Sequence, residues 1–504
     1  MSDPGAAATL ASYKKAIQAM LDLPPSDPRN WYRQAFTHTI DCPHGNWWFL
    51  VWHRGYIGWF EQICRELSGD PNFALPYWDW TKEPRVPAVM FDDVLTPTHS
   101  SFIGSFSEFE AQFKGPIAQL DCWKSGPPFD PDSKYAQLLV RGLRFPDDLW
   151  FDINKDPRGA LFFDRDHARG LTKDKPDFDT KTTLAVSQGM LLDALSPRDF
   201  ITFGSPKTFA HSGLTGFGIL EGQPHNKVHN CVGGVFTDAN GHTTDRGGFM
   251  QANLSPVDPL FFLHHANIDR LWDVWTRKQQ ARRYPILPDG FPTQPGGQIP
   301  KGSDYELWAG EPFLFFVDAK GNPVGKTQAG DYATIGDFDY DYQPGSGEEV
   351  VPVVGPVAAV PQTQSFSAGA ATLSSGSKDG GTVALPSALF SAGTDAPKLF
   401  AKITLALPPL SHAGDIAVTV DAPGSGLSTP GNTITLSMFG HHTIQGPVTF
   451  TIPLREPLKA IRANKRTTLN ALNFRVQPAA APPQLHAHAA DSKAQVLSIV
   501  VEAH

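Results

Sequence analysis

The chain has 504 residues, of which 41% are hydrophobic and 18% charged, a composition typical of a globular protein. That length exceeds one ordinary core, so two or three structural units are expected. The net charge of −9 argues against a nucleic-acid partner, and no apolar run is long enough for a membrane span. The N-terminus lacks a basic stretch followed by an apolar one, so a cytoplasmic location is the default expectation, with export left open.

Helices are expected first along the chain. Apolar residues recur at helical spacing in three segments, at 10–21, at 56–67 and after Pro259 at 268–275. Between about residues 87 and 212 the sequence is rich in Asp, Pro, Gly and Phe, and we expect loops there.

The amino-acid composition of the sequence changes near residue 345. All twelve tryptophans lie at or before Trp308, and residues 343–381 are rich in Pro, Gly, Ser and Ala. Apolar residues then alternate with period two in several short runs, which is typical of an antiparallel β-sandwich. The sequence therefore predicts a mainly helical unit at 1–345, a linker at 346–381 with one strand at most, and an all-β sandwich at 382–504.

Two histidines four residues apart, His225 and His229 in PHNKVHN, share one face of a predicted helix. Pro224 fits the first turn of that helix. A third histidine lies in the apolar segment DPLFFLHHANIDRLW, where a buried imidazole needs a metal or a hydrogen bond. His264 and His265 face different directions, so only one of them is expected to bind a metal.

A second cluster lies upstream in FTHTIDCPHGNWWFLVWHRGYIGWFE, which contains His38, His44 and His53. Dense tryptophans around these histidines make a dry wall that suits O2 chemistry better than a hydrolytic water site. Six neutral imidazoles without a carboxylate suit copper, with zinc as the main competitor. Catalytic zinc sites commonly include a carboxylate or keep a single metal with a water.

These segments resemble the copper A and copper B signatures of tyrosinases, polyphenol oxidases and haemocyanins. The resemblance rests on His44…FLVWHR…WFE, LPYWDW, PHNKVH and DPLFFLHHANID, and it spans about residues 30–275. It implies an antiparallel four-helix bundle around a type-3 pair of copper ions that uses O2 as co-substrate. It also implies two sets of copper ligands: His38, His44 and His53 for copper A, and His225, His229 and His265 for copper B.

The same resemblance implies roles for residues beside the ligands. His264 becomes a residue behind the ligands. Apart from the resemblance, a structural role is expected for Arg54, as an ion-pair or backbone anchor under the site, and for Asp269, as a residue that orients the helix of His265. Cys42-Pro43-His44 is similar to the Cys-x-His of fungal tyrosinases, in which the cysteine sulfur is bonded to the histidine. An unmodified Cys42, or one paired with Cys64, is the alternative.

In related polyphenol oxidases, a Glu and an Asn at the positions of Glu221 and Asn226 hold a water that takes the phenol proton. An ordinary helix N-terminus would show the same residues. Asn230 would line the substrate entrance, and Ala252 or Asn253 stands where plant enzymes often carry a bulky gate residue. Together these features favour hydroxylation of monophenols as well as oxidation of diphenols.

The resemblance implies small phenolic substrates and leaves the oligomeric state open. A C-terminal β domain often covers the copper site in this family, with a side chain in its entrance; Met438 and Phe439 are the candidates here. The alternatives are a catechol oxidase without hydroxylase activity, an O2 carrier like a haemocyanin unit, and a zinc hydrolase. For the C-terminal part the alternative is a stability or assembly module.

Overall fold

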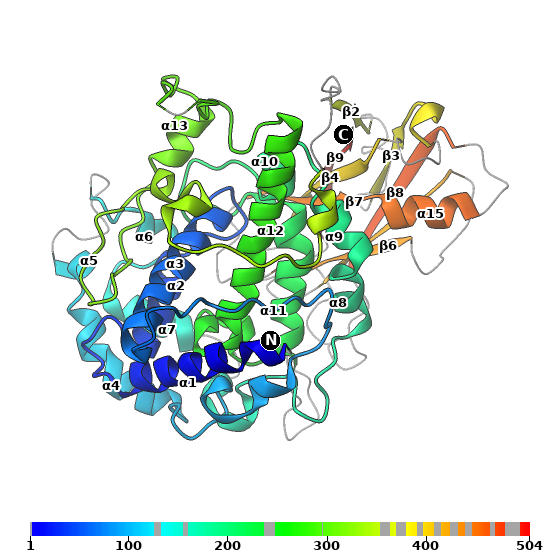
Figure 1. Cartoon of the computed structure of the whole chain (residues 1–504). Coiled ribbons are helices and arrows are strands. Elements are labelled where there is room, and N and C mark those ends of the chain that lie inside the picture. Colours follow the sequence, from blue (N-terminus) through cyan, green and yellow to red (C-terminus); the bar gives the residue numbers. More distant parts are fainter. Residues whose placement is uncertain are drawn as a thin grey trace.

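The computed structural model describes residues 3–124, 133–154, 160–235, 247–294, 296–352, 363–368, 380–390, 397–407, 415–423, 432–438, 446–463, 469–478 and 494–504. A helical part and a β part lie side by side, with the long helix α12 through the middle of the helical part (Figure 1). The mainly helical core with a C-terminal β domain expected from the sequence is confirmed.

The long helices follow the apolar periodicity of the sequence. α1 (Ala7–Asp22) buries Leu10, Tyr13, Ile17 and Met20 on one face. α2 (Trp31–Asp41) is capped by Asn30, whose side chain accepts the Tyr32 amide hydrogen. α3 (Phe49–Ser68) ends at Gly69, which has the left-handed conformation that favours glycine. α12 (Leu260–Arg282) follows Pro259 as predicted.

The helix of His225 and His229 begins earlier than predicted. A π-helical turn, η6 (Glu221–His225), precedes α11 (Asn226–Gly233), and Pro224 lies inside that turn. Proline has no amide hydrogen for the α-helical ladder, and a wider turn accommodates its ring. The π turn therefore sets where the first of the two histidines points.

The segment expected to form loops also contains short helices, which the sequence analysis did not predict. Several of them begin at a capping residue such as Ser105 or Asp179, and the longer ones bury aromatic side chains such as Phe109, Phe113 and Trp150. The α-helices of this segment are α4 (Phe106–Ala118), α5 (Asp121–Lys124), α6 (Gln137–Val140), α7 (Pro146–Asn154), α8 (Thr180–Ala185), α9 (Gln188–Ala194) and α10 (Phe200–Phe203). α13 (Asp304–Ala309) and α15 (Arg455–Ala463) complete the described α-helices.

The C-terminal part consists of two sheets. One has the strand order β1-β7-β4-β9-β2 and the other β3-β8-β5-β6. Apart from β1, the strands pair antiparallel, and their inner faces form a second hydrophobic core. The strands are β1 (Gly216–Phe217), β2 (Gln364–Ser367), β3 (Gly380–Ala384), β4 (Leu399–Ala406), β5 (Ile416–Asp421), β6 (Thr433–Leu436), β7 (Val448–Pro453), β8 (Ala471–Pro478) and β9 (Gln495–Ala503).

The two parts are less separate than the sequence suggested. β1 belongs to the helical part of the chain, yet it pairs parallel with β7 of the C-terminal sheet. At the start of the predicted linker, Ser346 donates its amide hydrogen to Asp79, and Glu348 pairs with Arg277 of α12. Composition alone gave no signal for these contacts. No described helix is long and apolar enough to cross a membrane.

Candidate metal centre

The six predicted ligands lie together in the interior of the helical part. His38 comes from α2, His44 from the loop after it and His53 from α3. His225 ends the π turn, His229 lies on α11 and His265 on α12. All six side chains are at most 2% exposed. The two sets meet where the His53 and His265 rings stack at 4.2 Å between centroids.

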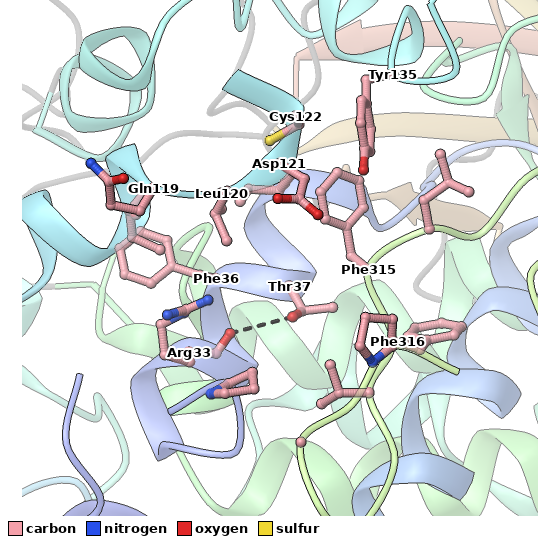
Figure 2. A pocket seen from close by; sticks show the side chains of 17 residues that line it. Arg33, Phe36, Thr37, Gln119, Leu120, Asp121, Cys122, Tyr135, Phe315 and Phe316 are labelled. Carbon is pink, nitrogen blue, oxygen red and sulfur yellow. Dashed lines mark hydrogen bonds between the residues drawn. The ribbon is translucent and has the colours of Figure 1, made fainter. Parts of the chain in front are cut away.

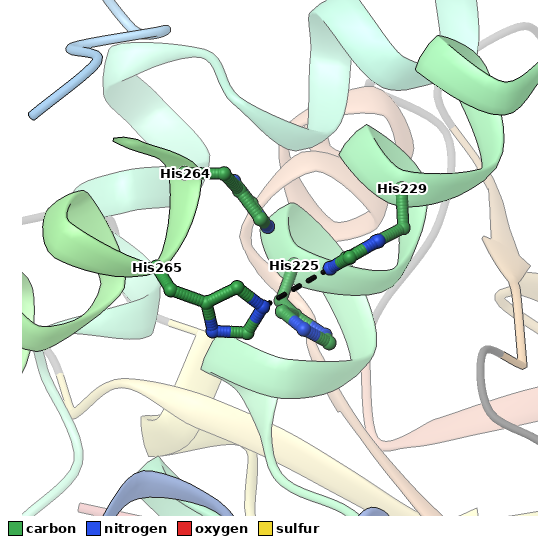
Figure 3. Close-up of side chains that lie close together, drawn as sticks. All are labelled: His225, His229, His264 and His265. Carbon is green, nitrogen blue, oxygen red and sulfur yellow. Dashed lines mark hydrogen bonds between the residues drawn. The ribbon is translucent and has the colours of Figure 1, made fainter. Parts of the chain in front are cut away.

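The arrangement around α11 and α12 fits a metal ion. The metal-binding atoms of His225, His229, His264 and His265 lie within 4.8 Å of one another (Figure 3). The Nε2 atoms of His229 and His265 face each other at 3.2 Å. Burial lowers the pKa of His229 to about 3, so its ring is neutral at physiological pH. Two neutral rings that converge on one point are suited to share a cation.

The upstream set, His38, His44 and His53, is also buried and closely spaced. The ring centroids of His38, His44 and His53 lie 5.3–5.7 Å apart. Burial lowers the pKa of His53 to about 3. Within the described residues, its buried Nε2 atom has no hydrogen-bond partner, a situation that costs free energy unless an ion is bound.

Backbone carbonyl groups orient three of these imidazoles. Nδ1–H of His53 donates to Phe49 O at 2.8 Å, and Nδ1–H of His229 donates to Met250 O at 2.8 Å. Nδ1–H of His38 donates to Asn253 O at 3.2 Å. A proton on Nδ1 leaves the lone pair of Nε2 for a metal, so these contacts fix the tautomer that a ligand needs.

His264 differs from its neighbour in hydrogen bonding. The Trp80 indole Nε1–H donates to Nδ1 of His264 at 3.2 Å. The proton of this neutral ring must then lie on Nε2, which cannot offer a lone pair. Distance alone includes His264 in the cluster, but the tautomer favours His265 as the ligand.

Cys42 lies beside His44, with 3.4 Å between Sγ and Nδ1. The thiol is buried, and burial raises its pKa to about 12. Arg141 donates to the carbonyl oxygens of Thr39 and Cys42, which holds the turn between His38 and His44. The sulfur is thus placed next to the ring to which the sequence predicts a bond.

Glu221 connects the two halves of the site. Its side chain is fully buried, and it accepts the Gly45 amide hydrogen at 2.7 Å and a hydrogen bond from the Ser205 hydroxyl. Gly45 follows His44, while Glu221 starts the turn that ends at His225. Burial raises the pKa of this carboxyl group to about 8, against the lowering effect of the two hydrogen bonds.

Asn226 and Asn230 face the C-terminal domain. The Asn226 side chain donates to Ser437 O at 2.9 Å, and that of Asn230 donates to Met438 O at 3.2 Å. Met438, one of the two candidates for a plug, is half-buried at this contact. Phe439, the other, lies outside the described residues.

Asn253 and Ala252, predicted near the entrance, are both buried, and Asn253 lies beside His38. Asn253 O accepts from His38 and from Thr39, and its side-chain amide donates to Asp152 at 2.6 Å. Ala252 is 8% exposed. The loop that contains Met250 and Asn253 thus orients one histidine of each set, a role that the sequence analysis missed because carbonyl acceptors leave no sequence signal.

A buried ion pair joins the helices of the two halves, as expected for Arg54 and Asp269. Arg54 Nε lies 2.7 Å from Asp269 Oδ1, and the guanidinium group stacks 3.6 Å above the Trp272 ring. Tyr340 and Tyr342 both donate to Asp269 Oδ2 at 2.8 Å. Fully satisfied buried charges of this kind fix one arrangement of α3 against α12.

His211 is a further buried titratable group near the site, and the sequence gave no reason to select it. It contacts Asp41 O at 2.6 Å and Glu311 Oε1 at 2.9 Å. Burial lowers its pKa, but the charges of Asp41 and Glu311 outweigh burial and the pKa is raised. The ring lies under the Asp41–Cys42 turn of the copper A half.

A separate cavity of about 230 Å³ lies along α2 (Figure 2). Arg33, Thr37, Asp121, Tyr135 and Phe315 are among the residues around it, and no predicted ligand is. It is therefore distinct from the histidine cluster.

The comparisons with known proteins agree with this site. Residues 28–278 match the family model described as the common central domain of tyrosinase. The chain is 28% identical over 342 residues to the chloroplastic polyphenol oxidase of Spinacia oleracea, covering 62% of this chain and 42% of the relative. It is 27% identical over 302 residues to aureusidin synthase of Antirrhinum majus, covering 56% and 44%. The matches thus span less than half the length of these relatives.

Two solved structures share the fold over nearly the whole chain. A latent aurone synthase superposes with a TM-score of 0.58 at 18% identity, covering 99% of this chain and 88% of that one. A latent apple tyrosinase gives 0.53 at 18% identity, covering 99% and 95%. On this evidence the chain belongs to the tyrosinase and polyphenol oxidase family and has the dinuclear type-3 copper site of that family, to which its buried histidines fit.

Proposed function

We propose that the chain oxidises small phenols with O2, both by o-hydroxylation of monophenols and by oxidation of o-diphenols to o-quinones. The observation that carries the hydroxylation step is Glu221, a buried carboxyl group with a raised pKa between the two halves of the site. Oxidation of a diphenol needs only the metal pair, whereas hydroxylation also needs a group that takes the phenol proton.

The proposed ligand set is that of the sequence analysis: His38, His44 and His53 for copper A, and His225, His229 and His265 for copper B. When bound, the two copper ions supply the two-electron chemistry with O2. The chain supplies neutral imidazoles in a dry interior, with carbonyl groups that keep three of the rings in the ligating tautomer.

Glu221 is the proposed proton acceptor. A free phenol loses its proton near pH 10, so a base is needed at neutral pH. With a pKa of about 8, the carboxyl group is ionised above that pH and takes the proton on a carboxylate oxygen, directly or through a water. Gly45 and Ser205 hold the group in place while it does so.

Substrate reaches the site beside Asn230 in this proposal, and the C-terminal domain covers that side. Met438 O accepts a hydrogen bond from the side-chain amide of Asn230. The domain then acts as a lid, and Met438 or Phe439 is the proposed plug. Cutting the full chain within residues 343–381 should increase phenol oxidation if the lid restricts entry.

A thioether between Cys42 and His44 is part of the proposal. The 3.4 Å separation of Sγ and Nδ1 places the sulfur at the edge of the ring. Mass spectrometry of the peptide around these residues from copper-loaded protein should show the loss of two hydrogen atoms, and the Cys42→Ser variant should not. An unaltered mass in the wild-type peptide would rule out the bond.

Oxygen uptake distinguishes the proposal from its alternatives. Copper-loaded protein is given a monophenol and then a diphenol, before and after cutting in residues 343–381. Uptake with both supports the proposal, and uptake with the diphenol alone indicates a catechol oxidase. No uptake with either, even after cutting, indicates an O2 carrier.

A further inference from the structure

One face of α11 holds a segment of the C-terminal domain. Asn226 and Asn230 donate to the carbonyl oxygens of Ser437 and Met438, at 2.9 and 3.2 Å. Lys227 Nζ donates to the Ser437 hydroxyl at 3.3 Å. Three donors from one short helix thus bind two consecutive residues that follow β6.

The side-chain amide of Asn226 is engaged at both ends. Its Nδ2–H donates to Ser437 O, and its Oδ1 accepts from Nδ1–H of His225 at 2.8 Å. A backbone carbonyl can only accept, so the NH2 group must face Ser437 and the oxygen must face His225. This orientation places the proton of His225 on Nδ1 and leaves its Nε2 lone pair for copper.

The Ser437 end of this connection is fixed by ionic groups. The Ser437 hydroxyl donates to Asp415 Oδ1 at 2.7 Å, and Lys181 of α8 pairs with the other oxygen of Asp415. Asn226 itself is 0% exposed, so water does not replace its partners. The carbonyl that orients the amide is therefore held at a defined position.

A second contact ties the same region to the C-terminal sheet. Gly216 and Phe217 of β1 pair with Thr449 and Phe450 of β7, and the Phe217 side chain belongs to the C-terminal hydrophobic core. Gly216 has φ of 154°, and a Cβ there would lie 2.1 Å from Thr449 O. Only glycine fits this close approach, which begins a few residues before the π turn.

We propose that Asn226 is a positioning residue through which the docked C-terminal domain sets the tautomer and the plane of His225. The domain is then a structural support of the copper B half as well as a cover. The copper A half has no such contact among the described residues. This inference rests on His225 as a copper ligand, which belongs to the proposed function.

The test is copper retention by the full chain, measured by atomic absorption during dialysis against a chelator. Asn226→Ala removes the acceptor for His225, and we expect one of two copper ions to leave about 10- to 100-fold faster than in the wild type, as for other residues that orient ligands. Asn230→Ala is the matched control: it removes the neighbouring contact with Met438 O, leaves Asn226 and Ser437 in place, and should retain both ions.

The Asn226→Asp variant separates the orientation of the His225 ring from the docking of the C-terminal domain. It also replaces Asn226→Ala as the test variant if that variant fails to fold. A carboxylate accepts from His225 with either oxygen but cannot donate to Ser437. We expect copper retention near that of the wild type, together with faster hydrogen–deuterium exchange in residues 432–438. Copper loss as fast as in Asn226→Ala would overturn the proposal.

Two further outcomes are decisive. Equal copper retention by Asn226→Ala and the wild type would refute the positioning role. Equal copper loss by Asn226→Ala and Asn230→Ala would show a general loss of docking and would also refute it. His225→Ala distinguishes this failure from a wrong ligand assignment: the variant should bind one copper ion per chain if His225 is a ligand, and two if it is not.

Discussion

The copper A and copper B halves of the site are supported in different ways. Around copper A, His53 donates to Phe49 O one turn earlier on its own helix, and His38 donates to Asn253 O within the helical part. Around copper B, His225 donates to Asn226, which in turn holds Ser437 of the C-terminal domain. Among these contacts, those of the first half lie within the helical part, and those of the second half also reach the C-terminal domain.

This difference shows how a buried ligand acquires its orientation. A carbonyl four residues back on a helix is guaranteed by helical geometry. A side-chain amide has two possible orientations and needs a third group to select one. The copper B half therefore depends on a contact between domains, while Glu221 and the Arg54–Asp269 pair tie the halves together.

The largest effect is expected from removal of a ligand in either half. His53→Ala and His265→Ala should each reduce copper from two ions to one per chain and lower phenol oxidation more than about 100-fold, beyond the loss seen for residues behind a ligand. Copper analysis and oxygen uptake measure this. His264→Ala should keep both ions; the reverse result would exchange the roles of His264 and His265.

Glu221→Gln should affect one reaction only. Monophenol hydroxylation should fall by about 10²- to 10⁴-fold, the usual contribution of a general base, while diphenol oxidation persists. In the wild type, hydroxylation should rise as the pH increases through about 8, because Glu221 ionises there. Parallel pH profiles for the two substrates, or equal losses in the variant, would contradict this role; exposed Glu110→Gln is the control.

The ion pair between the halves should matter mainly for stability. Arg54→Met leaves Asp269 charged and buried, and we expect the free energy of unfolding to fall by about 3–5 kcal/mol in chemical denaturation. Arg85→Met breaks the exposed pair with Asp177 and should cost about 0–1 kcal/mol. Similar costs for the two variants would show that the pair does not fix α3 against α12.

The smallest effect concerns His211 under the copper A turn. Its folded pKa lies above the usual 6.5, so protonated His211 stabilises the fold fully below pH 6.5. This contribution is lost as the pH rises through the folded pKa. The melting temperature of the wild type should fall as the pH rises from 6.5 through the folded pKa of His211. In the His211→Gln variant, the decrease in melting temperature that is due to His211 should be absent. A variant with the same pH dependence as the wild type would exclude His211 as its source.

Much of the fold followed from local patterns in the sequence. Helical spacing predicted α1, α3 and α12, and period-two alternation predicted β4, β5 and β7 of the C-terminal domain. The α-helices between residues 87 and 212 were missed; apart from α4 they have only four to nine residues, too few turns to show a period. Strand β1 was missed because two residues carry no alternation, and its pairing depends on a sheet more than two hundred residues away.

The sequence by itself predicted the metal-binding residues, because the spacing of His225 and His229 and the aromatic setting of His38, His44 and His53 are local features. Only the tertiary structure decided which nitrogen the rings of His229 and His38 offer, since the acceptors at Met250 and Asn253 come from segments that meet through folding, and the Asn226 amide beside His225 is oriented by distant Ser437. It also decided that the C-terminal domain reaches His225. Helical periodicity acts within a few residues, whereas hydrogen-bond partners in a buried site are selected by the packing of distant segments.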